Sequence, residues 1–241
     1  MSGLDPRLSK AVTAHSLVAT AISVVHSLRT RGLRHTLLFA LSGTLIPVLA
    51  ELVAVNVLKV VRHHARPQVG GVPLAIALLW YNVGYGTVAM VMGTSNPHKE
   101  RTAFVPTVAL AATSFDLLLD PFGMDLGLWE WSGDGPYAPE IKGPNGNGGI
   151  PLLNFAGWIA LTTSVALAYQ RLESAQNDAY ASGPGDGGGP ASQRAAALLL
   201  LSYYLPAVAW ALKRERRKYL LYSAPFATTL WAALKGRSAA S

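Results

Sequence analysis

Three acidic residues interrupt apolar stretches of the sequence and are its strongest candidates for chemistry. Glu51 lies within PVLAELVAVN, and Asp116 and Asp120 lie within SFDLLLDP. A charge near the centre of a bilayer costs about 2.5–3.5 kcal/mol on insertion scales, so an acid in such a stretch is by default a functional candidate. Asp116 and Asp120 are four residues apart and therefore project from one face of a helix. A carboxyl group that keeps its proton can act as a general acid, and a neighbouring carboxylate can act as a base.

The composition of the chain that must position these acids is that of a membrane protein. Of its 241 residues, 51% are hydrophobic and 14% are charged, whereas about 25% are charged in a typical soluble domain. The 20 basic residues exceed the 13 acidic ones and leave a net charge of +7. Short basic clusters between apolar runs suit anionic lipids better than nucleic acid. The chain has no cysteine, which excludes disulfides, thiol catalysis and thiolate metal sites.

Apolar runs of nearly 20 residues, the length that crosses a bilayer, dominate the sequence. They predict a single domain over residues 1–241, an all-α integral membrane protein with a bundle of about seven transmembrane helices. The predicted runs cover residues 11–28, 36–58, 70–93, 103–120, 150–169, 195–212 and 219–234.

Two connections are longer than the others. Residues 121–149 contain aromatic residues and the turn-forming string GPNGNGG, which predicts a Trp- and Gly-rich cap loop on one membrane face between helices 4 and 5. Residues 182–193, SGPGDGGGPASQ, predict a flexible linker. The basic cluster KRERRK at 213–218 favours a cytosolic amino terminus, because lysine and arginine are enriched in cytoplasmic loops.

The order of the runs predicts which residues share a depth in the membrane. Even-numbered helices end, and odd-numbered helices begin, on the face where the amino terminus lies, so the three acids fall in one layer. Pro47 cannot bond to the carbonyl of Gly43, which predicts a kink just before Glu51. Aromatic and amide residues predicted to lie in the same layer, and so to contact a substrate, are Trp80, Tyr81, Asn82, Tyr85, Trp129, Trp131, Asn154 and Trp158.

Each of these residues also has a structural interpretation. A carboxylate near a helix end can extend to the headgroups or cap a turn, and this applies most to Asp120, which precedes Pro121. Tyrosine and tryptophan often pack or anchor a helix at the membrane interface. We interpret four histidines as structural or as part of a basic loop, namely His15, His26, His63 and His64.

One long stretch resembles a known family. It begins FDLLLDPFGMDLGLWEW and continues through GPY and GIPLLNFAGW to Trp158, and it is similar to the carotenoid-biosynthesis membrane proteins that include hydratases of γ-carotene and bisanhydrobacterioruberin. The segment GGVPLAIALLWYNVGY at 70–85 is similar to that family's VP…W…Y segment, and Glu51 falls where the family has a glutamate. The resemblance implies an integral membrane enzyme that adds water across a terminal isoprenoid double bond without a cofactor.

For such a reaction, a carboxylic acid must protonate carbon, and water must then capture the tertiary carbocation. We assign the proton donor to Asp116 and the residue that orients or deprotonates water to Asp120 or Glu51. The amides of Asn82 and Asn154 are predicted to position the water. Ring faces that can stabilise the cation belong to Trp80, Tyr81, Trp129 and Trp158. The expected partners are a hydrophobic isoprenoid from the bilayer and anionic lipids, with no nucleic acid and no metal; the oligomeric state is left open.

Other functions remain as alternatives. A terpene cyclase would share the protonation step but capture the cation with an internal double bond. A magnesium-dependent prenyltransferase could use D-x-x-x-D, yet that class needs two acidic clusters and the sequence offers one. A proton-coupled transporter should show paired repeats or interrupted helices, and a retinal photoreceptor needs a lysine in mid-helix, whereas Lys59 and Lys235 lie near helix ends or beyond.

Overall fold

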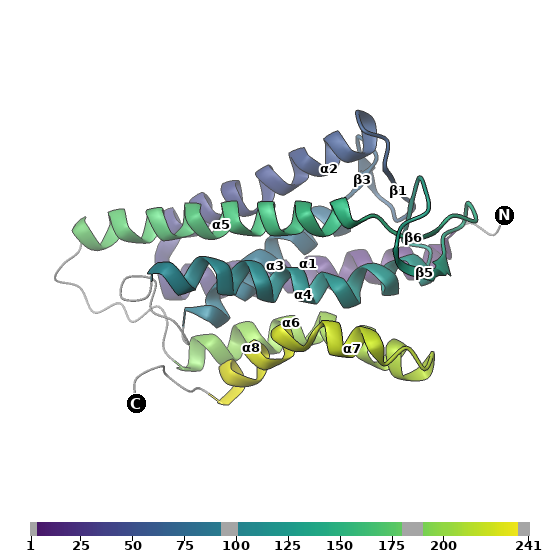
Figure 1. The fold of residues 1–241 in the computed structure, drawn as a ribbon. Coiled ribbons are helices and arrows are strands. Elements are labelled where there is room, and N and C mark those ends of the chain that lie inside the picture. Colours follow the sequence, from purple (N-terminus) through teal and green to yellow (C-terminus); the bar gives the residue numbers. More distant parts are fainter. Residues whose placement is uncertain (1–3, 93–100, 180–189, 236–241) are drawn as a thin grey trace.

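A computed structural model describes residues 4–92, 101–179 and 190–235, and most of these residues are helical (Figure 1). The helices, in chain order, are α1 (Pro6–Ala40), the π-helix η1 (Leu41–Leu45), α2 (Ile46–Asn56), α3 (Leu74–Val91), α4 (Arg101–Asp125), α5 (Leu152–Ala179), α6 (Pro190–Lys213), α7 (Lys218–Tyr222) and α8 (Ala224–Lys235). The strands are β1 (Val61–His63), β2 (Gln68–Val69), β3 (Val72–Pro73), β4 (Trp129–Trp131), β5 (Tyr137–Lys142) and β6 (Gly148–Ile150).

Within the described residues, five helices are long and apolar enough to cross a membrane. They are Pro6–Leu37, Leu74–Val91, Thr102–Asp125, Leu152–Arg171 and Ala191–Lys213. Large apolar side chains on their outer faces, such as Leu153 and Leu205, are exposed on the protein surface, as expected for contact with lipid. The chain is a multi-pass membrane protein.

The predicted count of seven spanning helices is not confirmed. The predicted run 36–58 is divided among the end of α1, η1 and α2, and the run 219–234 is divided between α7 and α8. Gly32 has a φ of 81° and interrupts α1, so the chain turns there before the second run begins. The π-helix η1 directly precedes α2, and Pro47 lies in the first turn of α2, before Glu51.

Helix α3 forms the centre of the bundle, and most of its side chains are buried. It packs against α1, α4 and α6. The face of α1 that meets these helices carries small hydroxyl side chains at helical spacing, which let the backbones approach closely. The buried members of this face are Ser9, Thr13, Ser16, Ser23 and Ser27.

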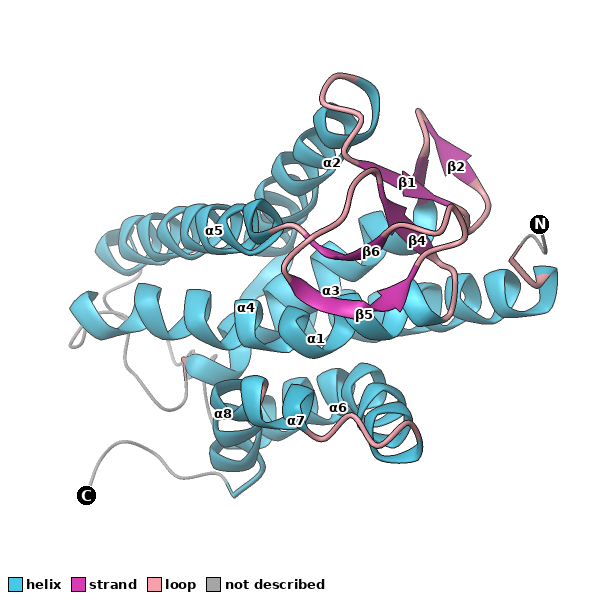
Figure 2. Cartoon of the chain, turned by 45° about the vertical axis from the view of Figure 1, so that its right-hand side comes forward, coloured by secondary structure: helices cyan, strands magenta, loops and turns pink. Residues whose placement is uncertain are grey.

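The strands form three two-stranded antiparallel sheets, β1–β4, β2–β3 and β5–β6, at the end of the bundle where α1 begins (Figure 2). The Thr13 hydroxyl donates to the carbonyl of Arg66 at 3.0 Å. The Tyr219 hydroxyl donates to Glu140 at 2.6 Å. The connections around 62–68, 121–149 and 213–218 therefore lie at one end of the bundle, as the order of the runs predicted.

Two predicted boundaries were wrong. Helix α4 does not end at Asp120 but continues through Pro121 to Asp125. Pro121 has no N–H to bond to the carbonyl of Leu117, and the Tyr137 hydroxyl donates to that carbonyl instead, at 2.5 Å. Burial raises the pKa of Tyr137, so this donor keeps its proton. In the predicted linker, residues 190–193 begin α6, and residues 182–189 lie outside the described residues.

Candidate active site

A cavity of about 50 Å³, which we call the carboxylate chamber, lies among α2, α3, α4, α5 and the β1–β4 pair. It is large enough for a few water molecules. Eight of the eleven predicted site residues line it: Glu51, Trp80, Asp116, Asp120, Trp129, Trp131, Asn154 and Trp158. Five other residues complete the lining: Val61, His63, Ile76, Leu79 and Leu119.

Asp116 and Asp120 lie one turn apart on α4 and are almost completely buried. One amide nitrogen joins them, because Asn154 Nδ2 lies 2.9 Å from Asp116 Oδ2 and 2.8 Å from Asp120 Oδ2. Asn154 can reach α4 because it is in the first turn of α5, directly after the sheet end of the bundle. Two carboxyl groups in one apolar site cannot both carry a full charge without large cost, so this pair is suited to share a proton.

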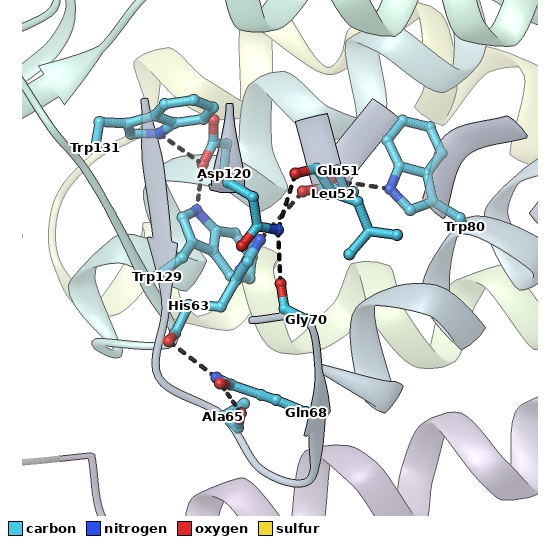
Figure 3. A network of polar contacts seen from close by, with 11 residues as sticks. Glu51, Leu52, His63, Ala65, Gln68, Gly70, Trp80, Asp120, Trp129 and Trp131 are labelled. Atoms are coloured by element: carbon cyan, nitrogen blue, oxygen red, sulfur yellow. Dashed lines mark hydrogen bonds and ion pairs between the residues drawn. The ribbon is translucent and has the colours of Figure 1, made fainter. Parts of the chain in front are cut away.

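Asp120 also accepts hydrogen bonds from two indoles (Figure 3). The Nε1 atoms of Trp129 and Trp131 lie 2.5 Å and 3.4 Å from Asp120 Oδ1. Both rings face α4 because alternate residues of a strand share a face, whereas Glu130 between them lies on the other face. Gly123 makes room for this contact, since a Cβ atom there would collide with the Trp129 ring.

The opposite wall of the chamber is built around Glu51. Its Oε1 atom accepts a hydrogen bond from Trp80 Nε1 at 3.1 Å, and its Oε2 atom lies 3.1 Å from His63 Nε2 (Figure 3). The Trp80 ring stacks on Trp158, with ring centroids 4.1 Å apart. Glu51 is therefore held by neighbours on α3 and β1 while its carboxylate remains at the chamber.

His63 is a chamber residue that the sequence analysis missed. We interpreted it as part of a basic loop, but it pairs with Trp129 across the β1–β4 ladder and faces the chamber. The signal was the alternation in Val61, Arg62 and His63, which places the first and third side chains on one face of a strand. His63 Nδ1 is buried and has no hydrogen-bond partner among the described residues.

Three of the predicted substrate contacts, Tyr81, Asn82 and Tyr85, do not line the chamber. Tyr81 and Tyr85 stack on each other and pack against Phe39, on another face of α3. Asn82 points toward α1 and α6. Each helical residue rotates the side chain by about 100°, so Trp80 faces the chamber while the residues after it turn away.

Asn82 is at the centre of a neutral polar cluster, which we call the Asn82 cluster. Its Oδ1 atom accepts a hydrogen bond from Ser23 at 2.9 Å. Its Nδ2 atom lies 3.0 Å from the Thr20 hydroxyl and 2.9 Å from the Tyr203 hydroxyl. These bonds join α1, α3 and α6 and give both the oxygen and the nitrogen of the amide a partner, which is a structural role.

Two larger cavities share lining residues with the chamber. The first, about 270 Å³, lies among α1, α3, α4 and α6, and we call it the α1–α6 arm. The second, about 250 Å³, lies between α2 and α5, and we call it the α2–α5 arm. Both linings are predominantly apolar, which is typical of cavities that bind small molecules.

Comparison with known proteins gives one family. The sequence model of the carotenoid biosynthesis protein family matches residues 11–183. Among curated proteins and among solved structures there is no significant match. The matched segment covers well over half of the sequence and contains every residue that lines the chamber. The chain belongs to the carotenoid biosynthesis protein family.

Proposed function

We propose that the protein is a membrane-embedded, cofactor-independent hydratase of an isoprenoid substrate. The observation that carries this proposal is the buried Asp116–Asp120 pair, bridged by Asn154 in a chamber with apolar cavities on both sides. Membership of a carotenoid biosynthesis family supports an isoprenoid as the substrate class. Protonating an alkene needs a carboxylic acid held away from bulk water, and the burial of this pair supports that role.

The hydrogen bonds favour different roles for the two aspartates. Asp120 accepts two indole N–H groups and shares the amide of Asn154, and such donors stabilise a carboxylate. Among the described residues, Asp116 accepts a side-chain hydrogen bond from the Asn154 amide alone, at 2.9 Å. We therefore assign the shared proton to Asp116 and the accepting carboxylate to Asp120.

The proposed reaction conserves the protons of the pair. Asp116 gives its proton to the less substituted carbon of the double bond, and the π electrons form the new C–H bond and leave a tertiary cation. The oxygen of a water molecule bonds to the cation, and Asp120 takes the proton that this water releases. Proton transfer from Asp120 back to Asp116 restores the enzyme, and the net change is addition of one water.

Aromatic rings and one amide oxygen support the remaining steps. The faces of Trp80 and Trp158 line the chamber and can stabilise a carbocation through their ring quadrupoles. Because the Asn154 nitrogen contacts the aspartates, its amide oxygen is the atom able to accept a hydrogen bond from water. Tyr81 and Asn82 do not line the chamber, so the proposed reaction gives them no role in cation stabilisation or water binding.

The test is product analysis in labelled water. Purified protein in lipid nanodiscs is incubated with linear carotenoids in H₂¹⁸O, and product mass is measured. A product with one labelled oxygen supports hydration, whereas an isomer of unchanged mass supports the terpene cyclase alternative, which the apolar chamber walls also permit. Turnover that disappears in EDTA and returns with Mg²⁺ would instead favour diphosphate chemistry.

We further propose that the chamber end of the bundle faces the cytosol. The basic segment 213–218 lies at that end, where anionic lipid headgroups would attract it. Because the chain has no cysteine, a single Lys213→Cys variant gives one unambiguous label. Labelling by a membrane-impermeant maleimide in inverted vesicles but not in intact cells is the expected result, and the reverse pattern contradicts this orientation.

A further inference from the structure

The two arms meet the carboxylate chamber through different residues. We infer, on the basis of the proposed function, that the α1–α6 arm binds the linear hydrocarbon chain of the substrate and that the α2–α5 arm admits the water. With this division, the fold itself determines the side from which each reactant reaches the carboxyl groups. It also assigns chain-length specificity to one arm and the choice between hydration and isomerisation to the other.

The junction of the α1–α6 arm with the chamber is apolar. The two cavities share Ile76, Leu79, Leu119 and Trp129. The Trp129 N–H is the polar group of this set, and it is already bonded to Asp120. A hydrocarbon chain can therefore cross this junction without separating a polar group from its partner, and burial of the chain is favourable by about 25 cal/mol per Å².

The junction of the α2–α5 arm with the chamber contains two polar side chains. Glu51 and Asn154 line both cavities, together with three tryptophans and Val61. Hydrocarbon placed here would desolvate the Glu51 carboxylate, whereas water would find acceptors on Glu51 and on the Asn154 amide oxygen. The polar junction therefore favours water over the chain.

The mouth of the α2–α5 arm reaches the sheet end of the bundle. Leu58, Val60 and Pro151 line it, and all three belong to the turns that join helices to strands. Turns of this kind lie at the membrane interface, where water is available. In this proposal the arm connects water at the membrane interface to the carboxyl groups of the chamber.

Two matched substitutions separate the arms. Gly157 lines the α2–α5 arm, and a Cβ atom added there meets nothing within 4 Å, so Gly157→Phe should fill the arm without displacing the fold. Ala11 lines the α1–α6 arm at an exposed position of α1, so Ala11→Phe should fill that arm. Each variant must be monodisperse and must unfold cooperatively. A phenylalanine variant that fails this check is replaced by the leucine variant at the same position, Gly157→Leu or Ala11→Leu.

Binding and product are measured separately. Quenching of tryptophan fluorescence by a linear C40 polyene reports binding, and mass analysis reports hydrated and unhydrated products. Ala11→Phe should weaken polyene binding by about tenfold or more, while turnover of a C10 isoprenoid changes by less than about twofold. Gly157→Phe should leave polyene binding within about twofold but lower the hydrated product about tenfold and raise the share of unhydrated isomer.

The outcomes distinguish this inference from the proposed function. If the wild-type protein forms the hydrated product but the two variants behave alike, show the reverse pattern or change nothing, the division between the arms is wrong. If the wild-type protein binds the polyene yet forms no product, the proposed function fails. The binding data on the two variants then still test whether the α1–α6 arm binds the hydrocarbon chain. Absence of polyene binding by the wild-type protein overturns both.

Discussion

Two asparagines inside the same bundle, the half-buried Asn154 and the fully buried Asn82, lie at the centres of polar clusters with different neighbours. Asn154 contacts two aspartates and faces the carboxylate chamber. Asn82 contacts hydroxyl groups of Thr20, Ser23 and Tyr203 and lines none of the described cavities.

The contrast shows how an amide inside the bundle serves structure or chemistry. Around Asn82 every partner is neutral and the amide itself lines no described cavity, so the hydrogen bonds hold three helices together. Around Asn154 the partners are ionisable and one side is open to a cavity, so the arrangement costs stability unless another molecule occupies the space. Burial of a polar residue in a membrane protein therefore indicates function only when its partners can change charge and a cavity adjoins them.

The largest effect in this comparison is expected from Asp116→Asn. The amide keeps the size of the carboxyl group but cannot give a proton to carbon, so turnover should fall by at least about 10²–10⁴-fold, the usual contribution of general acid catalysis. Thermal unfolding should change little. Rates and unfolding curves of both proteins in the same nanodiscs check this, and a variant that retains a near-normal rate would remove Asp116 as the acid.

A smaller loss of turnover is expected from Asn154→Ala. This change removes the N–H donor from both aspartates and the oxygen proposed to bind water, so turnover should fall by about 10–100-fold, the loss typical when the hydrogen-bond partner of a metal ligand is removed. The pH–rate profile should also move, because the balance of charge between the aspartates changes. A rate loss with an unmoved profile would indicate that Asn154 only packs.

Asn82→Ala should show the opposite pattern. It removes hydrogen bonds that join α1, α3 and α6, each worth about 0.6 kcal/mol and at most about 1.7 kcal/mol in membrane proteins, so the free energy of unfolding should fall by about 1–2 kcal/mol. Turnover per folded molecule should stay within about twofold of the wild-type value. Activity measured against the amount of folded protein, rather than total protein, is the deciding measurement.

The smallest effect concerns an exposed polar cluster at the sheet end of the bundle. Burial acts to raise the pKa of Glu140, but hydrogen bonds from Lys218 and Tyr219 outweigh it and lower this pKa from 4.5 to about 2. Because the unfolded chain binds the proton first, Glu140 stabilises the fold above about pH 4.5, and this contribution disappears as the pH falls toward 2. The difference in unfolding temperature between the wild type and Glu140→Gln should therefore be smaller at pH 3 than at pH 7.

Much of the chamber followed from local spacing. The i, i+4 spacing of Asp116 and Asp120 places both carboxyls on one face of α4, and the order of the runs places Glu51 and Asn154 at the same depth. The depth of a residue along a spanning helix depends on counting residues, which a sequence allows. Its direction around the helix axis depends on which neighbours pack there, and this is why the sequence grouped Tyr81, Asn82 and Tyr85 with the chamber residues although they contact other neighbours.

The amino-acid sequence by itself determined the membrane class, the family resemblance, the acid pair and the layer in which that pair lies, because each depends on composition or on spacing along one helix. Only the tertiary structure decided that His63 faces the chamber, since β1 and β4 pair across more than 60 residues of sequence and strand register is a non-local property. It also decided that two arms flank the carboxyl groups. A cavity is the space left by the packing of helices distant in the sequence, and no single segment encodes its shape.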